Sequence, residues 1–562
     1  MCPKKVFLIF FLIPLAFFQP NWVWIADKAF VSNNNLEFSI KLLWFTTHGY
    51  HCAEDWPVLV DINSDSNLEI IAEDGRDHTV VFSHDGKVLA NFSIFKYAWN
   101  PHSFVVDCDH DGRLECFFPM DTKLFIIDLG LLRIDDIVMY PNADRITGMI
   151  YGNWDDDEDM ELLISYYRKG LFMYDFEKQK MYFLMNESLV DSQKVSIWGY
   201  LRPLGNGKVI FLNSLTHYCA LGAVDILSRR VLWAVNISEL GISPTVFDDF
   251  LVGDFDGDGI KEIVIPGQYP ELYVFSSDRG ELEACFNFTD YAIRELSDSY
   301  FAVCDLDGDG VIEGLFACYP LFSYWSNKSV GFIAIINMRD YTVKKVITYL
   351  KEKFGYSGIA PYTLNILDVN LDGVYDILTM NCGNLTIYDG RTLEPMFTFN
   401  VSILFRDLEA SGYFWYWGTS LNRIVVWDID SDGRMEIINI GFATISVFRF
   451  IIEPFLVPLI YWNPPYGYLN AFGCFENFDR DHDRVADWVE AQFGFSNNSV
   501  DSDGDGVSDF DEILSIYRNM SYGNASPEYL WVFISLVFIP PIAITAVLVY
   551  CVRRRKNVGM RP

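Results

Sequence analysis

Short apolar stretches alternate with acidic, glycine-rich turns along most of the chain, and this pattern recurs about every 52 residues. Each repeat opens with an apolar run such as WPVLV (56–60) or RIVVW (423–427), continues through an acidic loop into a second apolar run, and ends in a hairpin such as 272–287. Four short strands per repeat are typical of a propeller blade. Because a lone four-stranded sheet cannot bury both of its faces, the repeats must stack around an axis. The pattern predicts an all-β propeller.

The repeats can be counted from their loops. A nine-residue acidic pattern begins at Asp61, Asp107, Asn153, Asp254, Asp305, Asp368 and Asp428. The stretch 198–214 keeps turn glycines and an apolar run, but it has Leu201, Gly205 and Val209 where the loop would need polar side chains. We interpret it as an eighth repeat that has lost its metal loop. An eight-bladed propeller is therefore expected, with seven blades as the alternative.

Oxygen-bearing side chains stand at positions one, three, five and nine of each loop. Carboxylates at this density repel one another unless a cation lies among them, and hard oxygen ligands suit Ca²⁺ better than zinc or copper. Asp-Gly is also a strong hairpin signal, so one copy alone would be ambiguous. Seven copies at equivalent places favour calcium, and the predicted side-chain ligands are Asp61, Asn63, Asp65, Glu69, Asp107, Asp109, Asp111, Glu115, Asn153, Asp155, Asp157, Glu161, Asp254, Asp256, Asp258, Glu262, Asp305, Asp307, Asp309, Glu313, Asp368, Asn370, Asp372, Asp376, Asp428, Asp430, Asp432 and Glu436.

These loops and their spacing resemble the FG-GAP and VCBS repeats of integrin α-like propellers, over about residues 45–465 of a propeller domain placed at 30–468. The resemblance implies that each loop joins the first two strands of a blade. It also implies that position seven binds the metal through its backbone carbonyl, which adds Asn67, Arg113, Asp159, Ile260, Val311, Val374 and Arg434 as ligands.

Two longer acidic loops follow the propeller, at 479–490 and 501–512. Their carboxylates stand at positions one, three, five, nine and twelve, which is EF-hand spacing. Short helices are expected at 488–495 and 510–517, and segment 474–518 resembles EF-hand-like and thrombospondin type 3 calcium modules. Arg484 replaces the usual sixth-position glycine in the first loop, which weakens it as a calcium site relative to the second; a solvated acidic linker is the alternative. We expect calcium to stiffen this segment into a stalk, with the ligands Asp479, Asp481, Asp483, Asp487, Glu490, Asp501, Asp503, Asp505, Asp509 and Glu512.

Composition agrees with a folded, cation-binding chain. The formal net charge is −34, and about half of the acidic residues lie in these nine loops. A hydrophobic content of 51% with 16% aromatic residues argues against disorder. Nucleic acid is not an expected partner, because there is no basic patch outside the last ten residues.

Both ends of the chain carry membrane signals. Residues 1–26 have the length of a signal peptide, with an uncleaved anchor as the alternative. After a linker at 519–528, residues 529–552 are long and apolar enough for a transmembrane helix, and the basic run 553–556 assigns the tail 553–562 to the cytoplasm. A single-pass protein of the cell membrane with an external N-terminal domain is expected, and ten N-x-S/T sequons, all before the span, indicate a glycoprotein. Cysteine spacing leaves open local disulfides, such as Cys108–Cys116 or Cys304–Cys318, and free thiols.

No catalytic motif was found, so the expected function is binding rather than catalysis: a calcium-stabilised adhesion protein whose propeller contacts an extracellular glycan or protein. A structural component of the cell envelope and a calcium-dependent polysaccharide lyase are the alternatives, since fold alone does not exclude chemistry.

The last prediction concerns how the two ends of the propeller ring are joined. Residues 35–47 alternate apolar and polar side chains upstream of the first loop, and we expect this strand to join the last blade as its outer edge, because an open ring would expose sheet edges. The segments 435–441, 445–450 and 455–462 are expected to supply the rest of that blade.

Overall fold

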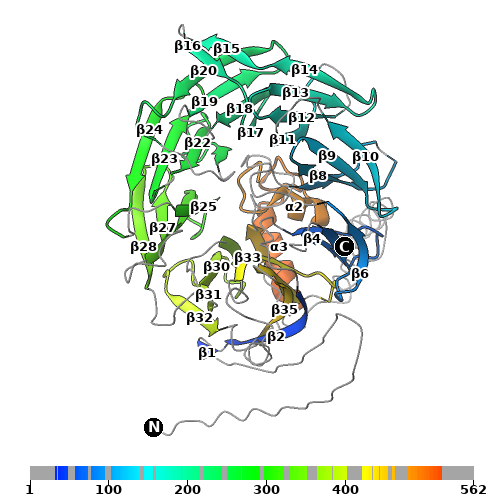
Figure 1. Cartoon of the computed structure of the whole chain (residues 1–562). Coiled ribbons are helices and arrows are strands. Elements are labelled where there is room, and N and C mark those ends of the chain that lie inside the picture. The colour runs from blue at the N-terminus through cyan, green and yellow to red at the C-terminus, as the bar shows by residue number, and fades with distance from the viewer. Residues whose placement is uncertain are drawn as a thin grey trace, which may run out of the picture.

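The computed structural model describes residues 32–33, 36–47, 57–73, 78–94, 103–109, 111–139, 145–155, 160–190, 193–213, 219–242, 250–267, 269–291, 297–320, 330–350, 364–381, 384–400, 421–432, 434–441, 444–453, 459–462 and 479–521. Eight antiparallel sheets surround a common axis (Figure 1), so the prediction of eight blades is confirmed and the seven-bladed alternative is wrong.

The first four blades follow chain order. Blade 1 comprises β3 (Val58–Val60), β4 (Glu69–Glu73), β5 (Thr79–Phe82) and β6 (Val88–Phe92). Blade 2 comprises β7 (Phe104–Val106), β8 (Glu115–Met120), β9 (Lys123–Asp128) and β10 (Arg133–Met139). Blade 3 comprises β11 (Ile146–Gly152), β12 (Glu161–Tyr166), β13 (Gly170–Asp175) and β14 (Lys180–Met185). Blade 4 comprises β17 (Tyr200–Gly205), β18 (Lys208–Asn213), β19 (Ala220–Asp225) and β20 (Arg230–Asn236).

Two of the other four blades gain a strand from elsewhere in the chain. Blade 5 comprises β21 (Leu251–Gly253), β22 (Glu262–Pro266), β23 (Glu271–Ser276) and β24 (Leu282–Asn287). Blade 6 comprises β25 (Ser297–Cys304), β26 (Glu313–Pro320), β27 (Val330–Asn337) and β28 (Thr342–Leu350). Blade 7 comprises β29 (Leu364–Asp368), β30 (Asp376–Asn381), β31 (Asn384–Tyr388) and β32 (Pro395–Asn400), with β36 (Leu459–Trp462) beside β29. Blade 8 comprises β33 (Leu421–Trp427), β34 (Met435–Gly441) and β35 (Thr444–Glu453), completed by β2 (Leu36–Thr47) and β1 (Ser32–Asn33).

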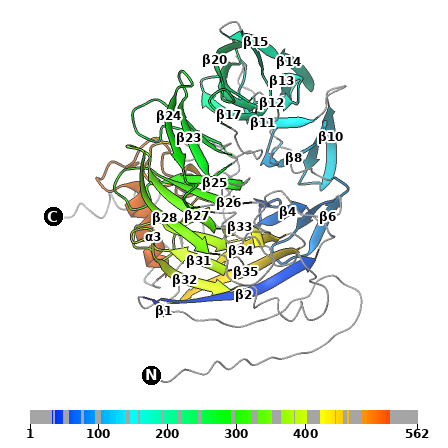
Figure 2. The same ribbon diagram turned by 60° about the vertical axis from the view of Figure 1, so that its left-hand side comes forward.

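Strand β2 closes the ring, as its alternating pattern predicts. It pairs antiparallel with β35 from Glu37↔Glu453 to Thr47↔Thr444, and its apolar face (Phe38, Ile40, Leu42 and Trp44) is buried. Figure 2 shows this long strand running along the last blade. The first and last parts of the propeller are therefore joined by backbone hydrogen bonds.

Two features differ from the expectation. Segment 455–462 does not fill the last blade: β36 pairs with the first strand of blade 7, because β2 already occupies the fourth place in blade 8. A separate hairpin of β15 (Glu187–Val190) and β16 (Gln193–Ser196), which the sequence pattern did not predict, precedes blade 4.

The segment after the propeller contains the two expected helices, α2 (Asp487–Phe493) and α3 (Asp509–Ser521). The expectation that it stands off as a stalk is wrong. Val489, Ile513 and Leu514 belong to the same buried apolar cluster as residues of blades 6 and 7. Two short helices cannot bury their apolar faces alone, so they pack on the propeller (Figures 1 and 2).

No helix among the described residues is long and apolar enough to cross a membrane. The predicted span 529–552, the signal peptide 1–26 and the tail 553–562 lie outside the described residues. The six cysteines that the structure describes, Cys108, Cys116, Cys219, Cys285, Cys304 and Cys318, form no disulfide with one another, so neither suggested pair is bonded.

Candidate calcium sites

Where the structure describes them, the acidic loops share one backbone conformation, which is held by their own side chains. The position-one carboxylate accepts hydrogen bonds from amides at positions four to six; in blade 5, Asp254 accepts from Gly257 and Gly259, both at 2.9 Å. The position-seven amide donates to the position-five carboxylate, as Ile260 does to Asp258 at 2.7 Å. Positions four and six have positive φ in most of these loops, which explains the recurrent glycines there.

The position-nine carboxylate is the most uniform feature. One of its oxygens accepts a hydrogen bond of 2.8–3.1 Å from the position-two amide in all nine loops: Glu69, Glu115, Glu161, Glu262, Glu313, Asp376, Glu436, Asp487 and Asp509. All nine side chains are buried. The propeller loops and the two C-terminal loops are thus built on the same nine-residue frame.

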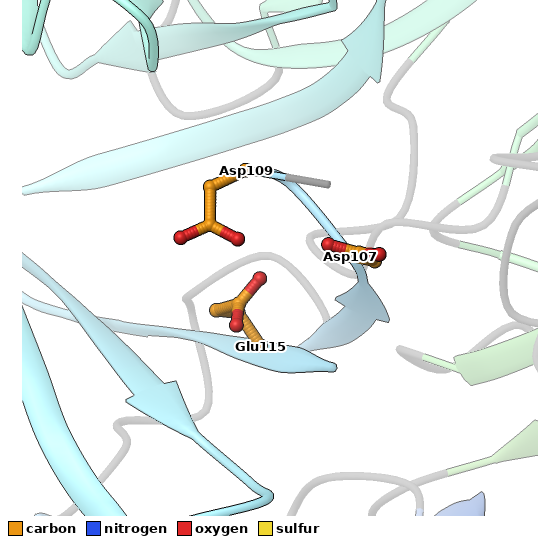
Figure 3. Close-up of side chains that lie close together, drawn as sticks. All are labelled: Asp107, Asp109 and Glu115. Carbon is orange, nitrogen blue, oxygen red and sulfur yellow. The ribbon is translucent and has the colours of Figure 1, made fainter. Parts of the chain in front are cut away.

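This frame brings the carboxylates together. In blade 2, oxygens of Asp107, Asp109 and Glu115 lie within 4.8 Å of one another, and Figure 3 shows the three carboxylates around a shared space. Blade 5 has the same arrangement in Asp254, Asp256 and Glu262. Three oxygen donors at this separation fit a hard divalent cation such as Ca²⁺.

Burial makes these carboxylates costly to ionise without a cation. Burial, with the nearby charge of Asp256 adding to it, raises the pKa of Glu262 to about 8, although the amide of Phe255 opposes the shift. Burial and four surrounding aspartates raise the pKa of Glu490 to about 9. A bound cation would reverse this preference, because it stabilises the ionised form.

In two loops, a basic side chain from another strand of the same blade lies among the predicted metal ligands. In blade 8, Arg449 contacts three predicted ligands, Asp430, Asp432 and Glu436. In blade 6, Lys344 contacts Asp307, Asp309 and Glu313. Neither residue could be assigned from the loop pattern, because they lie 13 and 31 positions after the position-nine acid.

Three other blades vary the frame. In blade 7 the shorter Asp376 uses both oxygens in backbone hydrogen bonds, to Val369 and Gly390. In blade 3 the predicted ligands Asp157 and Asp159 lie outside the described residues, whereas Glu161 is buried as elsewhere. In blade 4 only Asn206 and Gly207 separate β17 from β18, which agrees with a repeat that lacks the loop; its lack of metal stays a prediction.

The first C-terminal loop is more enclosed than its sequence indicates. Oxygens of Asp479, Asp481 and Asp483 lie within 4.8 Å of one another. Glu490 is 0% exposed, and neither of its carboxylate oxygens has a hydrogen-bond partner among the described residues. In the second loop, Asp503 and Asp505 are exposed and Glu512 is half-buried. The structure therefore offers the deeper oxygen site in the first loop.

Arg484 explains how the first loop tolerates its missing glycine. It keeps the positive φ of 79° that position six requires, and its side chain reaches the propeller. Nη2 donates to the carbonyl of Gly373 at 3.0 Å, and Nε lies 3.5 Å from Asp305 Oδ2. The guanidinium also stacks over Tyr375 and Phe510, at 5.2 and 4.4 Å from the ring centres. Arg484 is a docking residue between the C-terminal segment and blades 6 and 7.

Comparisons with known proteins add little. No protein-family model and no curated protein matches the chain. Similar solved structures include a europium-containing methanol dehydrogenase (TM-score 0.46, 9% identity, 73% of this chain and 93% of that one). BamB from Moraxella catarrhalis is another, with a TM-score of 0.38 and 8% identity over 73% of this chain and 99% of that one. BBS1N in complex with ARL6DN has a TM-score of 0.37 and 8% identity over 72% of this chain and 93% of that one. The eight-bladed architecture rests on the strand order itself, and the likeness to FG-GAP and VCBS repeats stays a resemblance in loop spacing.

Proposed function

We propose that this protein is a calcium-stabilised, membrane-anchored binding protein of the cell surface, whose propeller contacts an extracellular glycan or protein. Propellers often mediate binding, and the predicted signal peptide, sequons and membrane span support an external location. Catalysis is not part of the proposal.

The repeated position-nine carboxylate carries the calcium part of the proposal. It is a buried acid with one oxygen fixed by a backbone amide, beside two or three further carboxylates. Burying so many like charges is unfavourable unless a cation offsets them. We assign calcium to the loops of blades 1, 2, 3, 5 and 7 and to the two C-terminal loops.

The geometry also suggests which face binds the ligand. First strands of neighbouring blades contact one another (β3 with β7, β11 with β17, β17 with β21, β25 with β29), so they line the axis. The acidic loops therefore share one face, and the C-terminal segment packs on that face over blades 6 and 7. The turns between second and third strands, such as 121–122 and 167–169, lie at the opposite face, because neighbouring strands of a blade run antiparallel. We place ligand binding on that opposite face, since loops on a rigid scaffold commonly carry recognition and the C-terminal segment does not pack there.

The calcium assignment can be tested at blade 5. Glu262→Gln removes the buried charge but keeps the shape, whereas Glu281→Gln changes an exposed acid of the same blade. Equilibrium dialysis of the full-length protein with Ca²⁺ should show one ion fewer for Glu262→Gln and an unchanged number for Glu281→Gln. Equal numbers in both variants would contradict the assignment.

Ligand binding needs a separate assay. The full-length protein in lipid nanodiscs should bind a glycan array or cultured cells in calcium and lose that binding in EDTA. Assembly into ordered arrays on lipid without any such binding would favour the structural alternative.

A further inference from the structure

In blade 8, Arg449 contacts three of the four predicted side-chain ligands of the loop. Its Nε donates to Glu436 Oε1 at 2.7 Å, Nη1 lies 2.8 Å from Asp432 Oδ2, and Nη2 contacts Asp430. The other oxygen of Glu436, Oε2, accepts from the Ile429 amide, as in every loop. The guanidinium therefore takes the Glu436 oxygen that the Ile429 amide does not hold, together with the acids of positions three and five.

In blade 6 a lysine of the fourth strand, Lys344, contacts the equivalent loop acids. Lys344 Nζ lies 2.5 Å from Glu313 Oε1, 3.5 Å from Asp307 Oδ2 and 3.9 Å from Asp309 Oδ2. The position-one acid of this loop, Asp305, pairs with Arg484 of the C-terminal segment. All four predicted side-chain ligands of blade 6 thus have a protein cation beside them.

The equivalent positions in other blades are not basic. Arg449 lies directly across the sheet from the position-nine acid, where the register puts Asp128, Asp175, Ser276 and Asn337 in blades 2, 3, 5 and 6. Lys344 is the extra residue at a β-bulge in the fourth strand. The same bulge holds Leu89, Asp135, Leu232, Glu283 and Met396 in blades 1, 2, 4, 5 and 7. Blade 5 therefore has an acid where blade 6 has a lysine.

The geometry points to Arg449 and Lys344 as built-in replacements for the metal, so that the loops of blades 8 and 6 fold without Ca²⁺. A side-chain cation at three carboxylates offsets their repulsion and excludes a metal ion from the same oxygens. Arg113 of blade 2 is different, because its side chain is 44% exposed and among the loop acids it pairs with Asp111 alone. This inference rests on the proposed calcium binding of the remaining loops.

The wild-type protein gives the first test. Crystals of the full chain soaked in a lanthanide should show anomalous peaks at 254–262 and 107–115, and none at 305–313 or 428–436. Peaks at all four loops would overturn the inference while leaving the calcium proposal intact. No peak at any loop would overturn both.

Substitutions give the second test. Arg449→Gln and Lys344→Glu, the latter copying blade 5, should each gain one bound Ca²⁺ per molecule in equilibrium dialysis. Lys345→Gln is the matched control, because this neighbour pairs with exposed Glu394 outside the loop, and it should gain none. If neither variant gains an ion while folding normally, the inference is wrong; should a variant fail to fold, the wild-type peaks decide.

Discussion

Arg484 shows how one side chain can connect two structural units. Tyr375 donates its hydroxyl to the Arg484 carbonyl at 2.5 Å, while the Arg484 side chain reaches Gly373 and Asp305. A glycine at this place would suit the loop but would lose all the side-chain contacts. Arginine at this position therefore strains the backbone, but its side chain holds the C-terminal segment on the propeller.

Removing this side chain should release the C-terminal segment. Arg484→Gly relieves the backbone and deletes the contacts, and we expect a loss of about 3 kcal/mol in docking, since the Asp305 carboxylate loses its partner. Hydrogen exchange should become faster in α2 and α3 but not in blade 5. Arg391→Ala, at an exposed arginine in blade 7, is the control. Unchanged protection of α3 in Arg484→Gly would show that apolar packing alone holds the segment.

The buried acids should make stability depend on pH when calcium is absent. A carboxyl with a raised pKa binds its proton more tightly in the folded protein than in the unfolded chain. It therefore stabilises the fold fully below its ordinary pKa of 4.5, and this contribution is lost as pH rises through about 8 for Glu262 and about 9 for Glu490. In EDTA the melting temperature should fall between pH 5.5 and 9. A flat profile in EDTA would contradict the burial argument.

At the scale of elements, strand β2 is the piece on which the ring depends most. It pairs with blade 8, while Trp44 donates to the His84 carbonyl of blade 1 at 2.7 Å. Phe38 also packs on Phe397 of blade 7, with ring centres 5.0 Å apart. One strand thus touches three blades.

Deleting residues 30–47 should therefore destabilise the whole propeller rather than loosen one end. The milder Trp44→Ala should cost about 3–5 kcal/mol, the usual range for a large buried aromatic side chain. Chemical denaturation followed by blade-specific hydrogen exchange measures both. Loss of protection confined to blades 8 and 1 would contradict the closure argument.

Elements with a local pattern were predictable from sequence, and those set by distant pairing were not. The loops from Asp61 to Asp428 reveal themselves by spacing, and the alternation in 35–47 predicts a half-buried strand. The position of strand β36 could not be predicted. Its partner β29 lies about ninety residues earlier in the chain, and the sequence pattern alone would equally allow β36 to pair with blade 8. Arg449 and Lys344 become visible only once the register shows what lies across from Glu436 and Glu313.

At the scale of the whole molecule, the propeller has loops of two kinds. The loops of blades 2, 5, 6 and 8 all bring three acids within 4.8 Å of one another, but among the described residues only in blades 6 and 8 does a lysine or an arginine contact three of the predicted ligands. Blade 8 is also the closing blade, and its loop contacts blade 1 through the Leu68 amide and the Ile429 carbonyl at 2.8 Å. The ring closure is thus built to be independent of metal.

Chelation should consequently loosen the ring unevenly. Hydrogen exchange in EDTA should accelerate most in β21 and β22 of blade 5 and least in β33 and β34 of blade 8. Adding calcium back should restore slow hydrogen exchange in blade 5. Faster exchange in blade 8 than in blade 5 would contradict the distinction between the two kinds of loop.

Thermal unfolding of the full-length protein with and without calcium tests the central claim most directly. A ligand that binds only the folded state stabilises it by mass action, so several bound ions should act together. Calorimetry at pH 7.5 should give a melting temperature many degrees higher in millimolar Ca²⁺ than in EDTA, with Mg²⁺ much less effective. Superimposable melting curves in calcium and EDTA would contradict the account.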